Sequence, residues 1–171
     1  MVRLLEATAP ALVLGSTQAM PEGAQDIDVV RRRSGGGAVL VAPGDVVWVD
    51  VFVPRGDPRW DDDVGRAFWW LGEAWVRALG VEGAVVHKGA LVRNALSDLV
   101  CFAGLGPGEV TVDGAKLVGM AQRRTREGAL FQCAVPLTWD AARYAELLGL
   151  DRLDIPVRTL ENGERGATSR R

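Results

Sequence analysis

The segment Val46-Val-Trp-Val-Asp-Val-Phe-Val53 places a valine at every second position, with Trp48, Asp50 and Phe52 at the positions between. Because side chains alternate between the two faces of a strand, this pattern predicts a strand with one all-valine face for a core and a second, half-buried face. On that second face Asp50 lies among aromatic residues, either as a satisfied structural acid or as a carboxylate of a site. The chain is therefore expected to fold around a sheet.

Short segments rich in β-branched residues and bounded by Gly, Pro or Asp recur along the chain and predict further strands. The Asp113-Gly114 pair between two of them predicts a tight hairpin, because a two-residue type I′ turn needs a positive φ at both central positions. We expect the segments of the first half to share one sheet. The predicted strands cover residues 10–15, 27–30, 38–41, 84–87, 91–93, 99–102, 109–112, 115–118 and 129–135.

Two segments have the period of an amphipathic helix. One follows the acidic run Asp61–Asp63, carries Val64 on its apolar stripe and ends at Gly80, and the other runs from an N-cap at Thr138 to Leu148. Many strands with few helices predict an α+β fold, with mixed or antiparallel sheets packed against the helices. We expect a single domain over residues 1–160 and a disordered tail over residues 161–171, where no periodicity is present.

Composition excludes several classes of function. The 171 residues have a net charge of −2, without the basic surplus typical of nucleic-acid binders. No apolar run reaches the roughly 18 residues that span a bilayer, so we expect no membrane contact and a cytoplasmic location. Two cysteines, Cys101 and Cys133, and a single histidine, His87, predict neither a metal site nor a Ser-His-Asp triad.

The segment Arg31-Arg-Arg-Ser-Gly-Gly-Gly-Ala-Val39 is the first candidate for chemistry. Three adjacent glycines allow close approach of the backbone to a ligand and can direct successive N–H groups at one anion, while arginines supply charge-assisted donors. The segment lacks the Gly-Lys-Ser/Thr of a Walker loop and the spacing of a dinucleotide fingerprint. It is either an anion-binding loop or a flexible turn flanked by solvated arginines.

The second candidate is Lys116, which lies in an apolar strand beyond the predicted turn. With a two-residue turn it shares a face with Thr111, Val118 and Met120. A lysine in such a strand either reaches solvent at a sheet edge or holds a positive charge against a phosphate in a partly dry pocket. Arg123, at the far end of the strand, belongs either to the site or to a solvated face.

Together the two segments resemble the paired motifs of lipoate-protein ligases and the related octanoyltransferases of the biotin/lipoate ligase superfamily. The motifs are Arg31-Arg32-x-Ser34-Gly-Gly-Gly-Ala-Val39 and Asp113-Gly-x-Lys116-x-x-Gly119-x-Ala121-Gln122-x-Arg124, and the upstream segment Ala11–Gln18 is similar to the family's Gly-x-x-Gln region. The resemblance extends from about Pro10 to Val135. It implies a lipoate-protein ligase-like catalytic domain.

The resemblance also implies a reaction: lipoate attacks ATP, with Mg²⁺, to give lipoyl-adenylate, and a carrier lysine then displaces AMP. Lys116 matches the family's essential lysine. The implied acceptors are the lipoyl domain of a 2-oxoacid dehydrogenase or the glycine cleavage H protein. The residues that match the family's ligand-binding positions are Arg32, Ser34, Gly35, Gly36, Gly37, Ala38, Gly119, Ala121 and Arg123.

Two alternatives remain open within this resemblance. Some octanoyltransferases carry a Cys-Phe pair at a similar distance before the lysine, so Cys101 is a candidate thioester nucleophile for an octanoyl group from acyl carrier protein. The competing interpretation is that Cys101 is a small apolar residue that packs within a strand and has no catalytic role. The family's histidines after the glycine loop and in the strand at Gln132 are missing here, which is compatible with an acyl- or adenylate-binding module of impaired catalysis.

Overall fold

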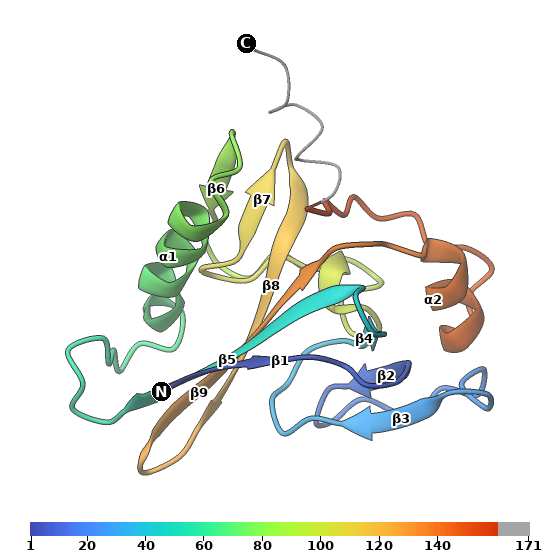
Figure 1. Ribbon diagram of the computed structural model, residues 1–171, viewed down its shortest axis with the longest axis horizontal. Coiled ribbons are helices and arrows are strands. Elements are labelled where there is room, and N and C mark those ends of the chain that lie inside the picture. Colours follow the sequence, from blue (N-terminus) through green and yellow to red (C-terminus); the bar gives the residue numbers. More distant parts are fainter. Residues whose placement is uncertain (161–171) are drawn as a thin grey trace.

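The computed structural model describes residues 1–160 and contains two sheets (Figure 1). The predicted disordered tail lies outside the described residues. The larger sheet is antiparallel throughout, with six strands in the order β1-β5-β9-β8-β7-β6. Its strands are β1 (Val2–Leu5), β5 (Val46–Pro54), β6 (Ala84–Val86), β7 (Val110–Val112), β8 (Ala115–Arg124) and β9 (Gly128–Pro136).

The smaller sheet has three strands in the order β3-β2-β4. Strand β2 (Ala11–Leu14) pairs in parallel with β3 (Asp28–Arg31) and antiparallel with β4 (Val39–Val41). The expectation of one sheet for the first half of the chain is therefore wrong, because β5 joins the larger sheet. The predicted α+β class with mixed and antiparallel sheets is confirmed.

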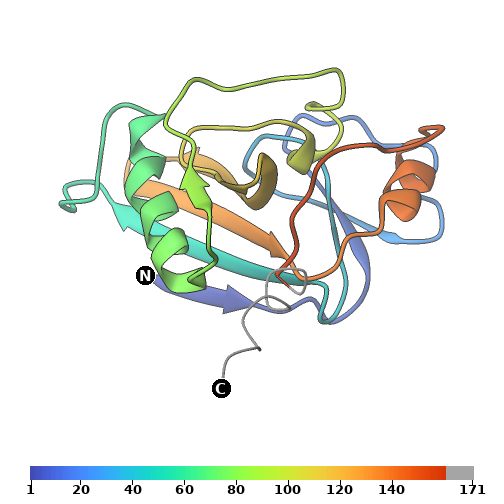
Figure 2. The same ribbon diagram turned by 90° about the horizontal axis from the view of Figure 1, so that it is seen from above.

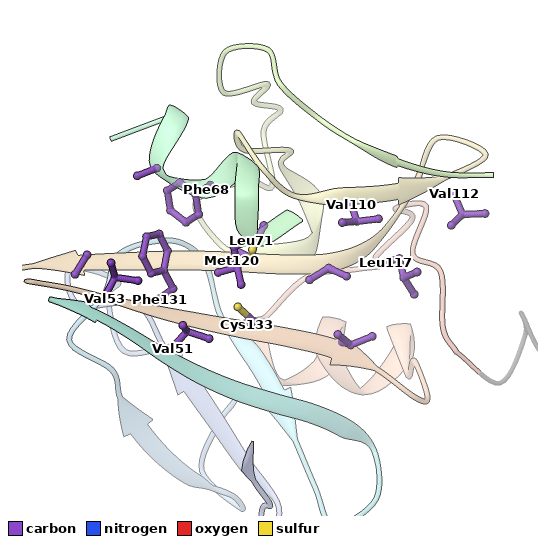
Figure 3. Packing of buried hydrophobic residues seen from close by; sticks show 14 residues of the cluster. Val51, Val53, Phe68, Leu71, Val110, Val112, Leu117, Met120, Phe131 and Cys133 are labelled. Atoms are coloured by element: carbon purple, nitrogen blue, oxygen red, sulfur yellow. The ribbon is translucent and has the colours of Figure 1, made fainter. Parts of the chain in front are cut away.

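The valine face of β5 packs under helix α1 (Trp69–Leu79) and forms the main core (Figure 3). Val51 and Val53 are buried, as the alternation predicts. Phe131 of β9 contacts Phe68 edge to face at 5.2 Å between ring centroids. The opposite face of the sheet carries Trp48, which contributes to a second core with β4 and helix α2 (Ala141–Leu148).

Asp50 proves to be a satisfied acid of this second face. Its Oδ1 accepts hydrogen bonds from the indole Nε1 of Trp48 at 2.9 Å and from the amide of Gln132 at 3.4 Å. The predicted Asp113-Gly114 turn is also confirmed, since both residues have a positive φ, of 51° and 78°.

Both predicted helices begin later than expected. The chain passes through a 3₁₀ turn, η1 (Arg66–Phe68), before α1, and Val64 is outside the helix and 57% exposed. The N-cap of α2 is Asp140 and not Thr138, because the Asp140 carboxylate accepts a hydrogen bond from the Arg143 N–H. Within residues 1–160, no helix is long and apolar enough to cross a membrane.

Two predicted strands in the connection between β6 and β7 are wrong. Residues 91–93 contribute only an isolated bridge between Val92 and Leu105, and residues 99–102 contribute a bridge between Val100 and Ala38 followed by a 3₁₀ turn, η2 (Cys101–Ala103). Figure 2 shows this connection running over the molecule from the side of α1 to the side of α2. It brings the turn that holds Cys101 against the end of the glycine loop.

Candidate functional site

A cavity of about 480 Å³ lies where the glycine loop, the η2 turn and strand β8 meet. Four segments distant in sequence contribute to it: the chain after β2, the glycine loop, the connection between β6 and β7, and strand β8. The residues that line it are Thr17, Gln18, Ala19, Gly35, Gly36, Gly37, Leu91, Arg93, Ser97, Asp98, Leu99, Cys101, Gly104, Gly106, Glu109, Lys116, Met120 and Ala121.

The guanidinium of Arg32 holds the glycine loop in shape from behind. It donates to the Ser34 hydroxyl at 3.1 Å, to the Val13 carbonyl at 3.1 Å, and to the carbonyls of Gly35 and Gly37, both at 2.8 Å. Arg32 is 7% exposed, and this burial lowers the pKa of its guanidinium. Because a planar guanidinium can satisfy several acceptors at once, one side chain fixes both ends of the glycine run.

The loop lies in direct backbone contact with the Cys101 turn. The Ala38 N–H donates to the Leu99 carbonyl at 2.8 Å, and the Cys101 N–H donates to the Ala38 carbonyl at 3.0 Å. A Cβ on Gly37 would lie 2.5 Å from the carbonyl carbon of Val100, closer than any side chain tolerates. Glycine is therefore required at this position for the two segments to meet.

Cys101 begins the η2 turn, lines the cavity and is partly exposed. Its Sγ lies 3.5 Å from the position that a Cβ on Gly119 would occupy, and Cε of Lys116 lies 3.3 Å from the same point. The thiol and the lysine therefore meet across Gly119, where the missing side chain leaves room for both.

Lys116 is only 4% exposed, so it does not reach solvent at a sheet edge. Its Nζ donates to the carbonyl oxygens of Cys101 at 2.7 Å and Gly104 at 3.0 Å, and it forms an ion pair with Oε2 of Glu109 at 2.7 Å. A bulge places it there: Thr111 pairs with Lys116 while Val110 pairs with Val118. The extra residue, Leu117, enters the core, and Lys116 reaches the cavity.

Glu109 is the residue of this site that the sequence analysis missed. It is 4% exposed, and besides Lys116 it accepts hydrogen bonds from the N–H groups of Gly106 at 2.6 Å and Met120 at 2.8 Å. The sequence did offer a signal for it: Glu109 directly precedes the apolar strand β7, and the next strand, β8, carries the opposite charge, Lys116, among apolar residues.

The structure brings together most of the predicted site residues. Gly35, Gly36, Gly37, Cys101, Lys116 and Ala121 line the cavity, and Gly119 lies against both Cys101 and Lys116. Ala38 is fully buried at the end of the loop and joins it to the Cys101 turn.

Three predicted ligand-binding residues lie elsewhere. Arg32 and Ser34 are buried behind the loop, where the Ser34 hydroxyl donates to the side chain of Gln132 at 2.7 Å. Arg123 lines a separate hollow of about 280 Å³ together with Arg3 and Asp50. Within residues 1–160, no three His, Cys, Asp or Glu side chains are grouped closely enough to hold a metal ion.

The sequence matches curated relatives over most of its length. It is 24% identical over 140 residues to octanoyltransferase LipM of Clostridioides difficile, which covers 80% of this chain and 51% of the relative. It is 31% identical over 138 residues to octanoyltransferase LipM of an Exiguobacterium species, which covers 77% of this chain and 49% of the relative. The chain thus spans about half the length of these relatives.

Solved structures share the fold. A Thermoplasma acidophilum protein described as a putative lipoate protein ligase with bound lipoic acid has a TM-score of 0.64 at 17% identity, covering 94% of this chain and 63% of the other. A lipoate-protein ligase A bound with ATP has a TM-score of 0.66 at 19% identity, with the same coverage. The family model of the lipoyl protein ligase A/B catalytic domain matches residues 1–162, and the chain therefore belongs to this family.

Proposed function

We propose that this protein transfers a medium-chain acyl group, octanoyl in the first instance, through a thioester on Cys101 to a lysine of a lipoyl carrier domain. The observation that carries this proposal is the partly exposed Cys101 thiol in a cavity between the glycine loop and Lys116. The names of the relatives, octanoyltransferase LipM, support the same reaction class. The donor is an acyl carrier protein that presents the group as a thioester.

The two steps balance without a further reactant. In the first, the sulfur of Cys101 attacks the donor thioester carbonyl, a new carbon–sulfur bond replaces the old one, and the thiol proton leaves on the carrier's sulfur. In the second, the amine of the target lysine attacks the Cys101 thioester, an amide forms, and Cys101 recovers a proton from that amine. The acyl group is neither oxidised nor reduced.

The glycine loop supplies donors for the oxyanion of both steps. In the part of the chain that the structure describes, the N–H groups of Gly35, Gly36 and Gly37 make no hydrogen bond to another protein group. Arg32 meanwhile occupies the carbonyls of Gly35 and Gly37. Preorganised amides of this kind stabilise a developing oxyanion at no cost in reorganisation.

A second candidate is the ATP-dependent ligase, which would use the same cavity for lipoate and the α-phosphate of ATP. It is favoured by the ATP-bound and lipoate-bound solved structures of the same fold. The free amides of the glycine loop would bind the phosphate, and the Lys116 ammonium would balance its charge. In this reaction the Cys101 sulfur forms no bond to the acyl group.

One experiment separates these functions. The protein is incubated with a lipoyl domain or a glycine cleavage H protein, and either octanoyl-acyl carrier protein or lipoate with Mg-ATP is added. Intact masses then report modification of the acceptor. We expect octanoylation from the carrier without ATP, lost in Cys101→Ser. Modification only with ATP, unchanged in Cys101→Ser, supports the ligase. Ligand binding without modification under either condition supports the binding module.

A further inference from the structure

The hydrogen bonds around Lys116 and Glu109 restrict where their protons can lie. Lys116 Nζ has three close partners, the carbonyls of Cys101 and Gly104 and the Glu109 carboxylate, and all three are acceptors. An ammonium has three hydrogens to give them, whereas a neutral amine has two and meets the third partner only if Glu109 carries the proton and donates to the amine lone pair. The contacts therefore allow two arrangements of one proton: an ammonium beside a carboxylate, or an amine beside a carboxylic acid.

The same count applies to Glu109. Its partners are the N–H groups of Gly106 and Met120 and the Lys116 ammonium, and all three are donors. A carboxylate accepts from all of them, whereas a carboxylic acid would have to donate to a neutral Lys116 amine from an oxygen that also accepts from Gly106. Because an aliphatic amine is a far stronger base than a carboxylate, we assign the proton of this pair to Lys116. Each side chain is only about 5% exposed, so removing one partner leaves the charge of the other buried and unpaired.

This pair also determines the shape of the Cys101 turn. Lys116 binds the carbonyl of Cys101, the first residue of η2, and the carbonyl of Gly104, which directly follows the turn. Glu109 in turn ties the Gly106 loop to β8 through the Met120 N–H. The nucleophile is therefore held by a side chain that has no lone pair available to accept its proton.

We propose that Glu109 is a positioning residue that holds Lys116 as an ammonium over both ends of the Cys101 turn, so that Lys116 acts as a fixed cation and not as the general base. This inference rests on the proposed acyl transfer through Cys101. The charged or titratable groups around Lys116 that line the same cavity are Cys101, Glu109, Arg93 and Asp98, with Arg32 behind the glycine loop. Arg93 and Asp98 pair with each other at 2.9 Å.

The chain offers a direct spectroscopic test because it contains only two lysines, Lys88 and Lys116. In protein labelled with ¹⁵N-lysine, the side-chain nitrogen spectrum holds two signals, and Lys88→Arg assigns them. We expect the Lys116 signal at neutral pH to be that of an ammonium with slowly exchanging hydrogens. A neutral-amine signal at neutral pH overturns the proposal, whether or not the protein transfers octanoate.

Glu109→Gln tests the positioning role. It keeps the size of the side chain but removes the charge, so the buried Lys116 ammonium loses its counter-ion and gives up a proton. We expect the Lys116 ammonium signal to disappear at neutral pH, and acyl-enzyme formation to slow by about 10-fold or more with little change in KM. Glu109→Asp, which restores the charge, should recover part of the rate.

Glu73→Gln is the matched control, because Glu73 pairs with Lys88 at the same 2.7 Å but on the surface, where both side chains are about half exposed. It should change neither the Lys116 signal nor the rate. A Glu109→Gln variant with an unchanged ammonium signal and an undiminished rate overturns the proposal. If the wild type shows the ammonium but forms no acyl-enzyme, the proposed function fails while the assignment of the ion pair stands.

Discussion

Lys116 and Cys101 are joined by a hydrogen bond of 2.7 Å from the lysine ammonium to the carbonyl oxygen of the cysteine. Because the bond goes to the backbone and not to the sulfur, the thiol stays open to the cavity while its turn is held in place. The group proposed to react, the Cys101 thiol, is thus distinct from the groups that hold its turn, Lys116 and the backbone carbonyls.

Replacing Lys116 should lower the free energy of unfolding more than replacing an exposed residue does. Lys116→Met leaves the Glu109 carboxylate buried without its cation, which we expect to lower the free energy of unfolding by about 3–5 kcal/mol. Chemical denaturation measures this change. The double variant Lys116→Met/Glu109→Gln should regain part of the loss, since no buried charge then lacks a partner. Equal losses in the single and double variants would contradict the buried pair.

The two ends of the glycine run should respond differently to alanine. A Cβ on Gly37 would clash with the backbone of Val100, whereas one on Gly35 has nothing within 4 Å. We expect Gly37→Ala to cost about 1–3 kcal/mol of unfolding free energy and to reduce acyl-enzyme formation, because the Cys101 turn must move. Gly35→Ala should stay within about 0.5 kcal/mol of the wild type. Equal effects would show that the loop does not touch the turn.

Arg32 should not tolerate lysine. A lysine ammonium cannot span the four acceptors that the guanidinium binds, so Arg32→Lys leaves buried carbonyls unpaired. We expect a loss of about 2–3 kcal/mol in unfolding free energy and a lower rate of acyl transfer. The neighbouring Arg33 is exposed, and Arg33→Lys serves as the control with no change expected in stability. A stable, fully active Arg32→Lys variant would contradict its role in shaping the loop.

The two cysteines should differ in reactivity. Burial raises the pKa of the Cys133 thiol to about 12, whereas Cys101 is partly exposed in the cavity. Iodoacetamide at about pH 8 should therefore label Cys101 and leave Cys133 unmodified until the protein unfolds, since the thiolate is the nucleophile. Peptide mass spectrometry after labelling reads the result. Labelling of Cys133 in the folded protein would contradict its burial.

The Cys133 pKa also has a consequence for stability. A thiol whose folded pKa is raised from 9.0 to about 12 contributes stability that is fully present below about pH 9 and is lost as the pH rises toward 12. We expect the free energy of unfolding to fall more slowly over this range in Cys133→Ala than in the wild type. Parallel curves for the two proteins would show that Cys133 titrates alike in the folded and unfolded states.

Local patterns were sufficient to predict the elements whose residues interact mainly within one strand or turn. The alternation of Val46–Val53 predicts β5, which extends over Val46–Pro54, and the Asp113-Gly114 pair predicts the turn before Lys116. The glycine loop and Lys116 could also be identified, because three adjacent glycines after three arginines and a lysine within an apolar strand are both unusual. Their resemblance to family motifs then indicated the α+β fold.

The remaining features depend on contacts between distant segments. Strand β1 (Val2–Leu5) was missed because it is an exposed edge strand held by β5 alone. The Cys101 segment looked like a strand but forms a 3₁₀ turn, since Lys116 binds its carbonyls from another hairpin. The contact between Glu109 and Lys116 requires a bulge that leaves no mark in the local sequence.

The most direct test of the central claim is the intact mass of this protein after mixing with octanoyl-acyl carrier protein in the absence of ATP. We expect a single octanoyl adduct on Cys101, absent in Cys101→Ser and removed when a lipoyl domain is added. An unmodified protein whose lipoyl domain becomes acylated only with ATP would contradict transfer through Cys101.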